Sequence, residues 1–213
     1  MAKVTLHGPD YRTQVRTIRL CLVEKGVEYE LVPVDVFRGE NHKPAFLKLQ
    51  PFGVVPVLVH DAFTLYETSA IARYVDEAFK GPKLQPSDKK EVARMNQIVS
   101  IIEAHGYGPI VTEIVGPRAK QAFLRQQVDN AAIQKAVPHA QYCLNVIEGL
   151  MGDGGFLVGG SLSLADLHLA PIIAYFAQTP EGKRVLAKLP KLTGWWEGIA
   201  ARPSVVETEP HTV

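Results

Sequence analysis

Cysteine is scarce in this chain, which has only Cys21 and Cys143 among its 213 residues. The two are far apart in sequence and fall in helical patterns, which favours buried thiols over a disulfide or a redox pair. A strong charge of one sign is also missing, because the chain has 23 basic and 22 acidic side chains and therefore a formal charge of +1. This balance argues against a nucleic acid or an acidic membrane as the partner.

Long apolar runs are missing as well. The longest, residues 167–177, is interrupted by His168 and Pro171 and is too short to span a bilayer. The opening residues 1–8 lack the apolar stretch of a secretory signal. The seven histidines show no metal-ligand spacing. With 46% hydrophobic residues the chain can bury a proper core, so we expect a cytoplasmic globular protein with no metal and no membrane anchor.

The N-terminal part alternates between strand-like and helix-like segments, which predicts a layered α/β unit. Its first long helix shows an apolar stripe and ends before Gly26, and Pro44 suits the first turn of a short helix. The predicted strands are 3–6, 29–34, 57–59 and 63–66, and the predicted helices are 12–25, 44–49 and 68–79.

The rest of the chain shows only helical periods. Residues 80–88 hold two prolines and one glycine without an apolar period, so they predict a linker between a domain at 1–79 and a helical domain at 89–213. Ser163 and Asp166 form a capping-box pattern before a helix that is apolar nearly all round. We therefore interpret Asp166 as structural and this helix as the buried centre of the second domain.

An unusual apolar segment lies at residues 50–58, which read QPFGVVPVL. Proline cannot donate to a sheet ladder, so Pro56 fits at the head of a strand, especially if a cis Val55–Pro56 bond presents the Val55 backbone outward. Residues 67–71, ETSAI, indicate a helix that begins directly after a short strand, with its first amides facing an anion. Together the two segments predict a site that holds a small acidic peptide by its backbone and its carboxylate.

Seven phrases carry a resemblance to a known family, in the order that the family has them. The chain resembles a cytosolic glutathione transferase of the phi-like type found in plants and bacteria. The resemblance implies a thioredoxin-like N-terminal domain, an all-helical C-terminal domain and glutathione as the co-substrate. The phrases are RLCLVEKG at 19–26, PVD at 33–35, GE at 39–40, QPFG at 50–53, VP at 55–56, ETSAIARY at 67–74 and SLSLAD at 161–166.

The resemblance places glutathione on the two segments described above. Glu67 would pair with the ligand ammonium group, and Thr68 would bind the γ-glutamyl carboxylate through its hydroxyl and amide. Val55, before Pro56, would bind the ligand's cysteine through its backbone, as an added strand does. The alternatives are that Thr68 only caps a helix beside a solvated Glu67, and that Val55 and Pro56 form a plain hydrophobic turn.

The glycine carboxylate of glutathione would bind at Asn41, His42 and Lys43, where the family has a His-Lys pair. Counting without gaps puts Asn41 and His42 at those positions, and a slip of one residue puts His42 and Lys43 there. A basic residue is present either way. The alternative is a solvated loop.

The sequence differs from the family at the position of the residue that activates the thiol. Without gaps, Arg12 stands at the catalytic serine of the phi-like type, and it has no hydroxyl. If Arg16 is instead aligned with the arginine that follows the serine, Tyr11 takes the serine's place, and Thr13 is a further hydroxyl nearby. Arg12 could itself stabilise a thiolate, the nucleophilic form, as a fixed cation. We rank Tyr11 first, Thr13 next and Arg12 third.

The resemblance also implies an electrophile pocket and a homodimer. His105 and Tyr107 would face the electrophile, although Tyr107 could equally pack in the core. Phe52 would insert between helices of a second copy, unless it only covers its own proline turn. The expected reaction is attack of the glutathione thiolate on a small electrophile, in detoxification. The alternatives are a glutathione-binding protein with little transferase activity, and a glutathione-dependent peroxidase or isomerase.

Overall fold

The computed structural model describes residues 3–210, and contacts within the chain divide it into two compact units. The first holds the residues up to 84 together with those from 203 onward, and the second holds residues 85–202. The sequence assigned everything after residue 88 to one helical domain. The structure differs at the end of the chain, where helix α10 (Pro203–Glu207) packs on α1 (Thr13–Glu24) within the first unit.

The first unit is built on a four-stranded sheet in the order β2-β1-β3-β4. Strand β1 pairs in parallel with β2, and β3 runs antiparallel to both β1 and β4. This mixed sheet with its helices confirms the predicted thioredoxin-like domain. The strands are β1 (Val4–His7), β2 (Glu30–Val32), β3 (Val57–His60) and β4 (Phe63–Tyr66).

The strand register brings three segments of the chain to one end of this sheet. His7, the last residue of β1, lies opposite Val57, the first residue of β3. Val57 in turn lies opposite Tyr66, the last residue of β4. The loop after β1, the turn before β3 and the start of α3 (Thr68–Ala78) therefore meet there.

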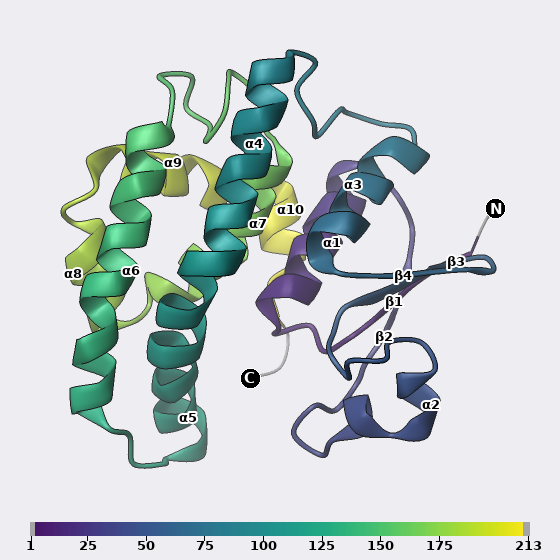
Figure 1. The fold of residues 1–213 in the computed structure, drawn as a ribbon, viewed down its shortest axis with the longest axis horizontal. Helices are drawn as coiled ribbons and strands as arrows, with labels where there is room; N and C mark the ends of the chain where they lie inside the picture. Colours follow the sequence, from purple (N-terminus) through teal and green to yellow (C-terminus); the bar gives the residue numbers. More distant parts are fainter. Residues whose placement is uncertain (1–2, 211–213) are drawn as a thin grey trace. The chain divides into compact units, whose positions relative to one another are not determined.

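Helices cover both faces of the sheet. Helices α1 and α3 lie on one side, and α2 (Pro44–Leu47) lies on the other (Figure 1). Val57 packs in a cluster with Val34 and Phe46 on the α2 side, so its neighbour Leu58 faces α1 and α3, because side chains alternate along a strand. Pro44 begins α2 as predicted, since proline suits the first helical turn.

A buried ion pair ties the end of α1 to the end of α3. The Lys25 Nζ donates to Asp76 Oδ1 at 3.0 Å and to the carbonyls of Asp76 and Pro82 at 3.0 and 2.9 Å. The same Asp76 oxygen accepts from the Leu84 N–H at 2.8 Å. These bonds explain why the first unit extends to Leu84 and includes part of the predicted linker.

The second unit contains helices and loops, with no strand among residues 85–202, which confirms the predicted all-helical domain. Among residues 3–210, no helix is both long enough and apolar enough to cross a membrane. The α-helices of this unit are α4 (Lys89–Ile101), α5 (Gly116–Leu124), α6 (Asn130–Leu150), α7 (Leu164–Phe176), α8 (Pro180–Leu186) and α9 (Pro190–Ala200).

Helix α7 is the buried centre of the second unit, and its predicted capping box is present. Asp166 accepts from both the N–H and the Oγ of Ser163 at 2.8 and 2.7 Å, and from the Leu157 N–H at 2.8 Å. Burial raises the pKa of the Asp166 carboxyl against the opposing effect of these bonds. The indole of Trp195 also donates its Nε1–H to Asp166, at 2.8 Å.

Between α4 and α5 the chain continues as two π-helical segments, η2 (Ile102–Gly106) and η3 (Gly108–Val115). Proline inside a helix usually kinks or breaks it, and Pro109 lies near the start of η3. In the structure the helix widens there rather than breaks, and Gly106 in the wide turn leaves room for Cys143 of α6, whose Sγ lies 3.3 Å from where a Cβ would stand.

Candidate active site

The turn before β3 lies against the loop after β1. The Val55–Pro56 bond is cis, and Pro56 directly precedes the strand. A Cβ at Gly8 would lie 3.3 Å from the Val55 Cβ and would clash with a methyl group of Val15. The absence of a side chain at Gly8 therefore allows the two loops to approach closely, as the peptide-binding edge predicted from the sequence requires.

The third segment at this end of the sheet is the start of α3. Glu67 has a φ of 74° and a ψ of 117°, a conformation that a non-glycine residue keeps only where its surroundings enforce it, often at ligand sites. The Glu67 side chain is exposed and makes no capping bond. Thr68 is the first residue of the helix, whose first turn contains no acidic residue, so the positive end of the helix dipole is available to an anion.

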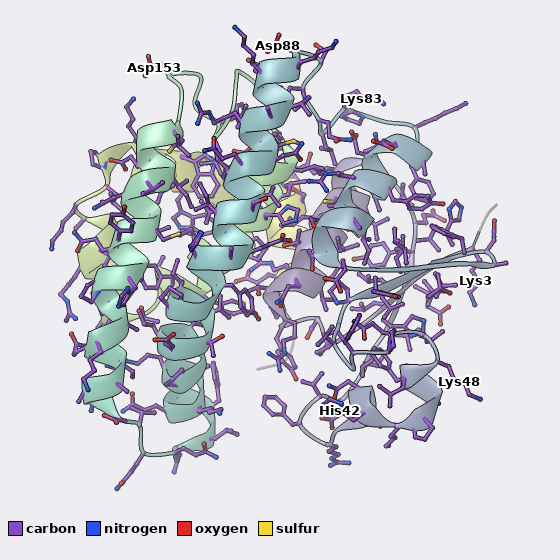
Figure 2. All side chains as sticks on the ribbon, in the orientation of Figure 1. Lys3, His42, Lys48, Lys83, Asp88 and Asp153 are labelled. Carbon is purple, nitrogen blue, oxygen red and sulfur yellow. The ribbon has the colours of Figure 1, made fainter. Side chains whose placement is uncertain are left out.

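The loop with Asn41, His42 and Lys43 lies beside the proline turn. The buried Asn41 donates its Nδ2 to the Gly53 carbonyl at 2.7 Å. A Cβ at Gly53, whose φ is 65°, would lie 2.5 Å from the His42 Nδ1. Asn41 therefore joins the two loops, whereas the side chains of His42, near α2 (Figure 2), and Lys43 are exposed.

Arg12 occupies the start of α1 as its N-cap residue, without a side-chain cap. Its Nε is buried and has no hydrogen-bond partner within the described residues 3–210. The Tyr11 ring stacks on Phe37, with the ring centres 5.8 Å apart, and burial raises the pKa of Tyr11 against the lowering effect of the Arg12 charge. The hydroxyl of Thr13 is buried and donates to Gln14 Oε1 at 3.3 Å.

Comparison with known proteins identifies the family. The model of the glutathione S-transferase N-terminal domain matches residues 4–77, and that of the C-terminal domain matches residues 54–203. The chain belongs to the glutathione S-transferase family. Glutathione S-transferase F13 of Arabidopsis thaliana is 31% identical over 96% of this chain and 94% of its own length.

Solved structures give the same assignment for the fold of this transferase. Glutathione transferase F7 of Populus trichocarpa superposes with a TM-score of 0.83 and 33% identity, over 96% of this chain and 97% of the other. A glutathione S-transferase I bound to lactoylglutathione gives a TM-score of 0.85 and 28% identity, over 97% and 98%. Relatives of the F type and poplar structures of the same type support the phi-like assignment.

The two cysteines of this transferase are both free and buried, as the sequence predicted. Burial raises the pKa of Cys21, and it raises the pKa of Cys143 to about 11. Thiols with raised pKa values are poor nucleophiles near neutral pH. The reactive sulfur of the transferase is therefore that of its co-substrate glutathione.

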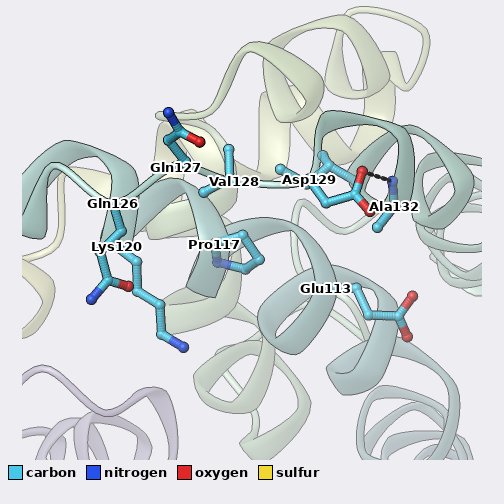
Figure 3. Close-up of a pocket in the computed structure, with 9 residues that line it drawn as sticks. Glu113, Pro117, Lys120, Gln126, Gln127, Val128, Asp129 and Ala132 are labelled. Carbon is cyan, nitrogen blue, oxygen red and sulfur yellow. Dashed lines mark hydrogen bonds between the residues drawn. The ribbon is translucent and has the colours of Figure 1, made fainter.

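The residues expected at the electrophile pocket both lie in the widened helical segment of the second unit. His105 is exposed and Tyr107 is partly buried. A cavity of about 360 Å³ in the same unit lies elsewhere, where α5 turns into α6 (Figure 3). It is lined by Glu113, Pro117, Lys120, Gln126, Gln127, Val128, Asp129, Ala132 and Ile133.

Gln50 is a residue of the site region that we did not single out from the sequence. It is fully buried, and its Oε1 accepts from the Phe52 N–H at 2.6 Å and the Val54 N–H at 3.4 Å. These bonds shape the turn that leads to Val55. Its position directly before the turn residues Pro51 and Gly53 could have indicated this role, because the amides of such a turn need a hydrogen-bond acceptor.

Proposed function

We propose that the transferase activates glutathione at the end of the sheet where α1 and α3 begin, and adds the thiolate to a small electrophile. The observation that supports this most is the strand register, which brings the Val55 turn, the start of α3 and the start of α1 together. Glu67 and Thr68 would bind the γ-glutamyl end, and the Val55 backbone would bind the cysteine. Steady turnover of a chloronitroaromatic substrate tests this function.

Arg12 is the residue we now rank first for thiol activation, ahead of Tyr11 and Thr13. The Thr13 hydroxyl is already bonded to Gln14, whereas the buried Nε of Arg12 lacks a partner within residues 3–210. A guanidinium group keeps its charge at all relevant pH values, so it stabilises a thiolate without losing a proton. Tyr11, whose pKa is raised, stays protonated and could donate a second bond.

The glycine carboxylate of glutathione would bind at His42 and Lys43, with Asn41 as the residue that fixes their loop. This choice favours the alignment with a slip of one residue, because the amide of Asn41 is engaged with Gly53. Lys43 shares its ammonium with Glu40 at 3.3 Å and is exposed enough to reach a ligand.

The electrophile would be a planar aromatic compound. The stacked rings of Tyr11 and Phe37 form a flat apolar surface beside Arg12, and the Phe37 side chain is 71% exposed. Aromatic rings prefer offset stacking on such a surface. His105 and Tyr107, in the helical domain predicted at 89–213, stay the residues that we propose for electrophile binding in that domain. A cytoplasmic role in detoxification fits this substrate class.

Two alternatives use the same scaffold. A glutathione-binding protein with little transferase activity is motivated by the missing serine, and it would bind glutathione but show no turnover. A glutathione-dependent peroxidase or isomerase would ionise the thiol but prefer a hydroperoxide or an isomerisable substrate. Comparing turnover of these three substrate classes under one set of conditions separates the alternatives.

Replacing Glu67 with alanine is expected to weaken glutathione binding by more than about tenfold, because a charge-assisted contact contributes about 1.5–3 kcal/mol. Isothermal calorimetry measures the affinity. Glu77→Ala is the matched control, since it removes an exposed carboxylate from the other end of α3. Equal affinities of a folded Glu67→Ala variant and the control would refute the assignment.

We further propose a homodimer in which Phe52 inserts between helices of the second copy. Phe52 is 69% exposed beside the exposed Val54, and its ring forms a T-shaped pair with the ring of Tyr66, with the ring centres 6.3 Å apart. Burying an aromatic ring contributes about 1.5–3 kcal/mol, and two-fold symmetry uses the contact twice.

Phe52→Ala is therefore expected to shift sedimentation from dimer toward monomer, and to weaken glutathione binding through the adjacent Val55 turn. Phe63→Ala, which removes a 49% exposed ring at the opposite end of β4, is the control and should leave the dimer intact. A wild-type protein that sediments as a monomer at micromolar concentration contradicts the dimer.

A further inference from the structure

The segment that follows the helical unit returns to the first unit and packs on α1. Ser204, Val205 and Thr208 are buried there, with 4%, 6% and 0% of their surfaces exposed. The Thr208 N–H and Oγ–H both donate to the Ser204 carbonyl, at 3.1 and 2.8 Å, which continues the helical turn of α10. Ser204 also donates its hydroxyl to Glu24 at the end of α1.

Two buried arginines of α1 hold the carboxyl end of α10. The Arg16 Nη2 donates to the Val205 carbonyl at 2.9 Å, and the Arg16 Nε donates to Thr208 Oγ1 at 3.5 Å. The Arg19 Nη1 donates to the Thr208 carbonyl at 2.9 Å. Carbonyl groups at the end of a helix carry partial negative charge, so guanidinium groups bind them favourably.

Arg12, the residue proposed to activate the thiol, lies on the same side of α1 as these two arginines. Residues 12, 16 and 19 follow helical spacing and therefore lie along one stripe. The Arg16 N–H donates to the Arg12 carbonyl at 2.9 Å, in the first turn of the helix. No side chain caps α1 at Arg12, so the position of the first turn depends on the hydrogen bonds that the helix makes further along its length.

We propose that residues 203–208 are a positioning element for the thiol of glutathione, with Arg16 and Thr208 as the positioning residues. Their hydrogen bonds fix the rotation and the axial position of α1, and so the place of Arg12 and of the first helical amides relative to the sulfur. This inference rests on the proposed function, since it requires a thiolate at the start of α1.

The variant Thr208→Val tests the proposal because it removes the hydroxyl and keeps the shape of the side chain. We expect the thiol pKa of bound glutathione to rise by about one half to one unit, a factor of about three to ten in ionisation. We expect kcat to fall by a similar factor while KM for glutathione changes less than about twofold. Thr208→Ser keeps the hydroxyl and is expected to restore both values.

The matched control is Thr179→Val in the second unit. The buried Thr179 hydroxyl also bonds a carbonyl, that of Phe176 at 2.8 Å, and it caps α8 through the Gly182 N–H at 2.9 Å. This control is expected to lower stability and leave the thiol pKa unchanged. If Thr208→Val lowers stability to the same degree and also leaves the thiol pKa and kcat unchanged, the proposal is overturned.

A second readout separates failure of this inference from failure of the proposed function. If the wild-type protein neither ionises glutathione nor turns over an electrophile, the proposed function fails, and hydrogen exchange then decides the positioning role. Faster exchange of the amides of residues 13–16 in Thr208→Val than in Thr179→Val supports a segment that fixes the start of α1. Equal exchange rates in the two variants overturn it.

Discussion

Replacing Lys25 with methionine is expected to lower the free energy of unfolding by about 3–5 kcal/mol, because it leaves the buried Asp76 carboxylate without its cation. The side chains of Lys25 and Asp76 are 0% and 1% exposed. The ammonium group uses its three protons on Asp76 Oδ1 and on the carbonyls of Asp76 and Pro82. Urea unfolding followed by circular dichroism measures the loss.

Two further variants make this result specific to the buried charge. Lys3→Met removes the exposed ion pair with Glu30, whose 3.1 Å separation is similar, and it should change stability by less than about 1 kcal/mol. The double variant Lys25→Met/Asp76→Asn keeps an acceptor for the Leu84 N–H without a buried charge, and it should be more stable than Lys25→Met alone. A Lys25→Met variant as stable as Lys3→Met contradicts the structural role of the pair.

Arg12→Leu is expected to reduce kcat/KM by about a hundredfold, the equivalent of about two pKa units of thiol activation. The physical reason is the loss of a fixed cation at the positive end of α1, where the thiolate would lie. Steady-state kinetics at saturating electrophile, together with calorimetric affinity for glutathione, separates lost activation from lost binding. Most of the loss should appear in kcat.

The matched control for Arg12 is Arg38→Leu, which removes an exposed arginine paired with Asp35 at 3.4 Å in the loop between β2 and α2. It should retain activity within about twofold, as surface substitutions generally do. Tyr11→Phe should reduce activity less than Arg12→Leu. If Tyr11→Phe or Thr13→Ala causes the large loss and Arg12→Leu does not, the order predicted from the sequence is correct. The order proposed from the structure, with Arg12 first, is then wrong.

The elements of the first unit could be predicted from the sequence because their signals are local. Gly26 lies just past α1 with a φ of 66°, and Pro44 begins α2. The segment around Pro56 indicated the head of a strand, and β3 begins at the next residue. Apolar periodicity and turn residues determine local structure over a few positions. The elements that they predict therefore form in any tertiary context that buries the same face.

The long-range contacts that hold the first unit together could not be predicted, because they join residues far apart in the chain. The binding of Arg16 to Val205 spans 189 positions, and that of Lys25 to Asp76 spans 51. No period or spacing in the sequence indicates which buried cation finds which carbonyl. The same holds for the Thr13 hydroxyl, whose bond to the adjacent Gln14 depends on side-chain rotamers that the sequence does not specify.

The measurement that tests the central claim most directly is a titration of thiolate absorbance for glutathione bound to the wild-type transferase. We predict a thiol pKa about two units below that of free glutathione, because Arg12, as the main cation at the start of α1, would stabilise the anion by about 2.7 kcal/mol. A bound thiol that titrates at the pKa of free glutathione would contradict the account.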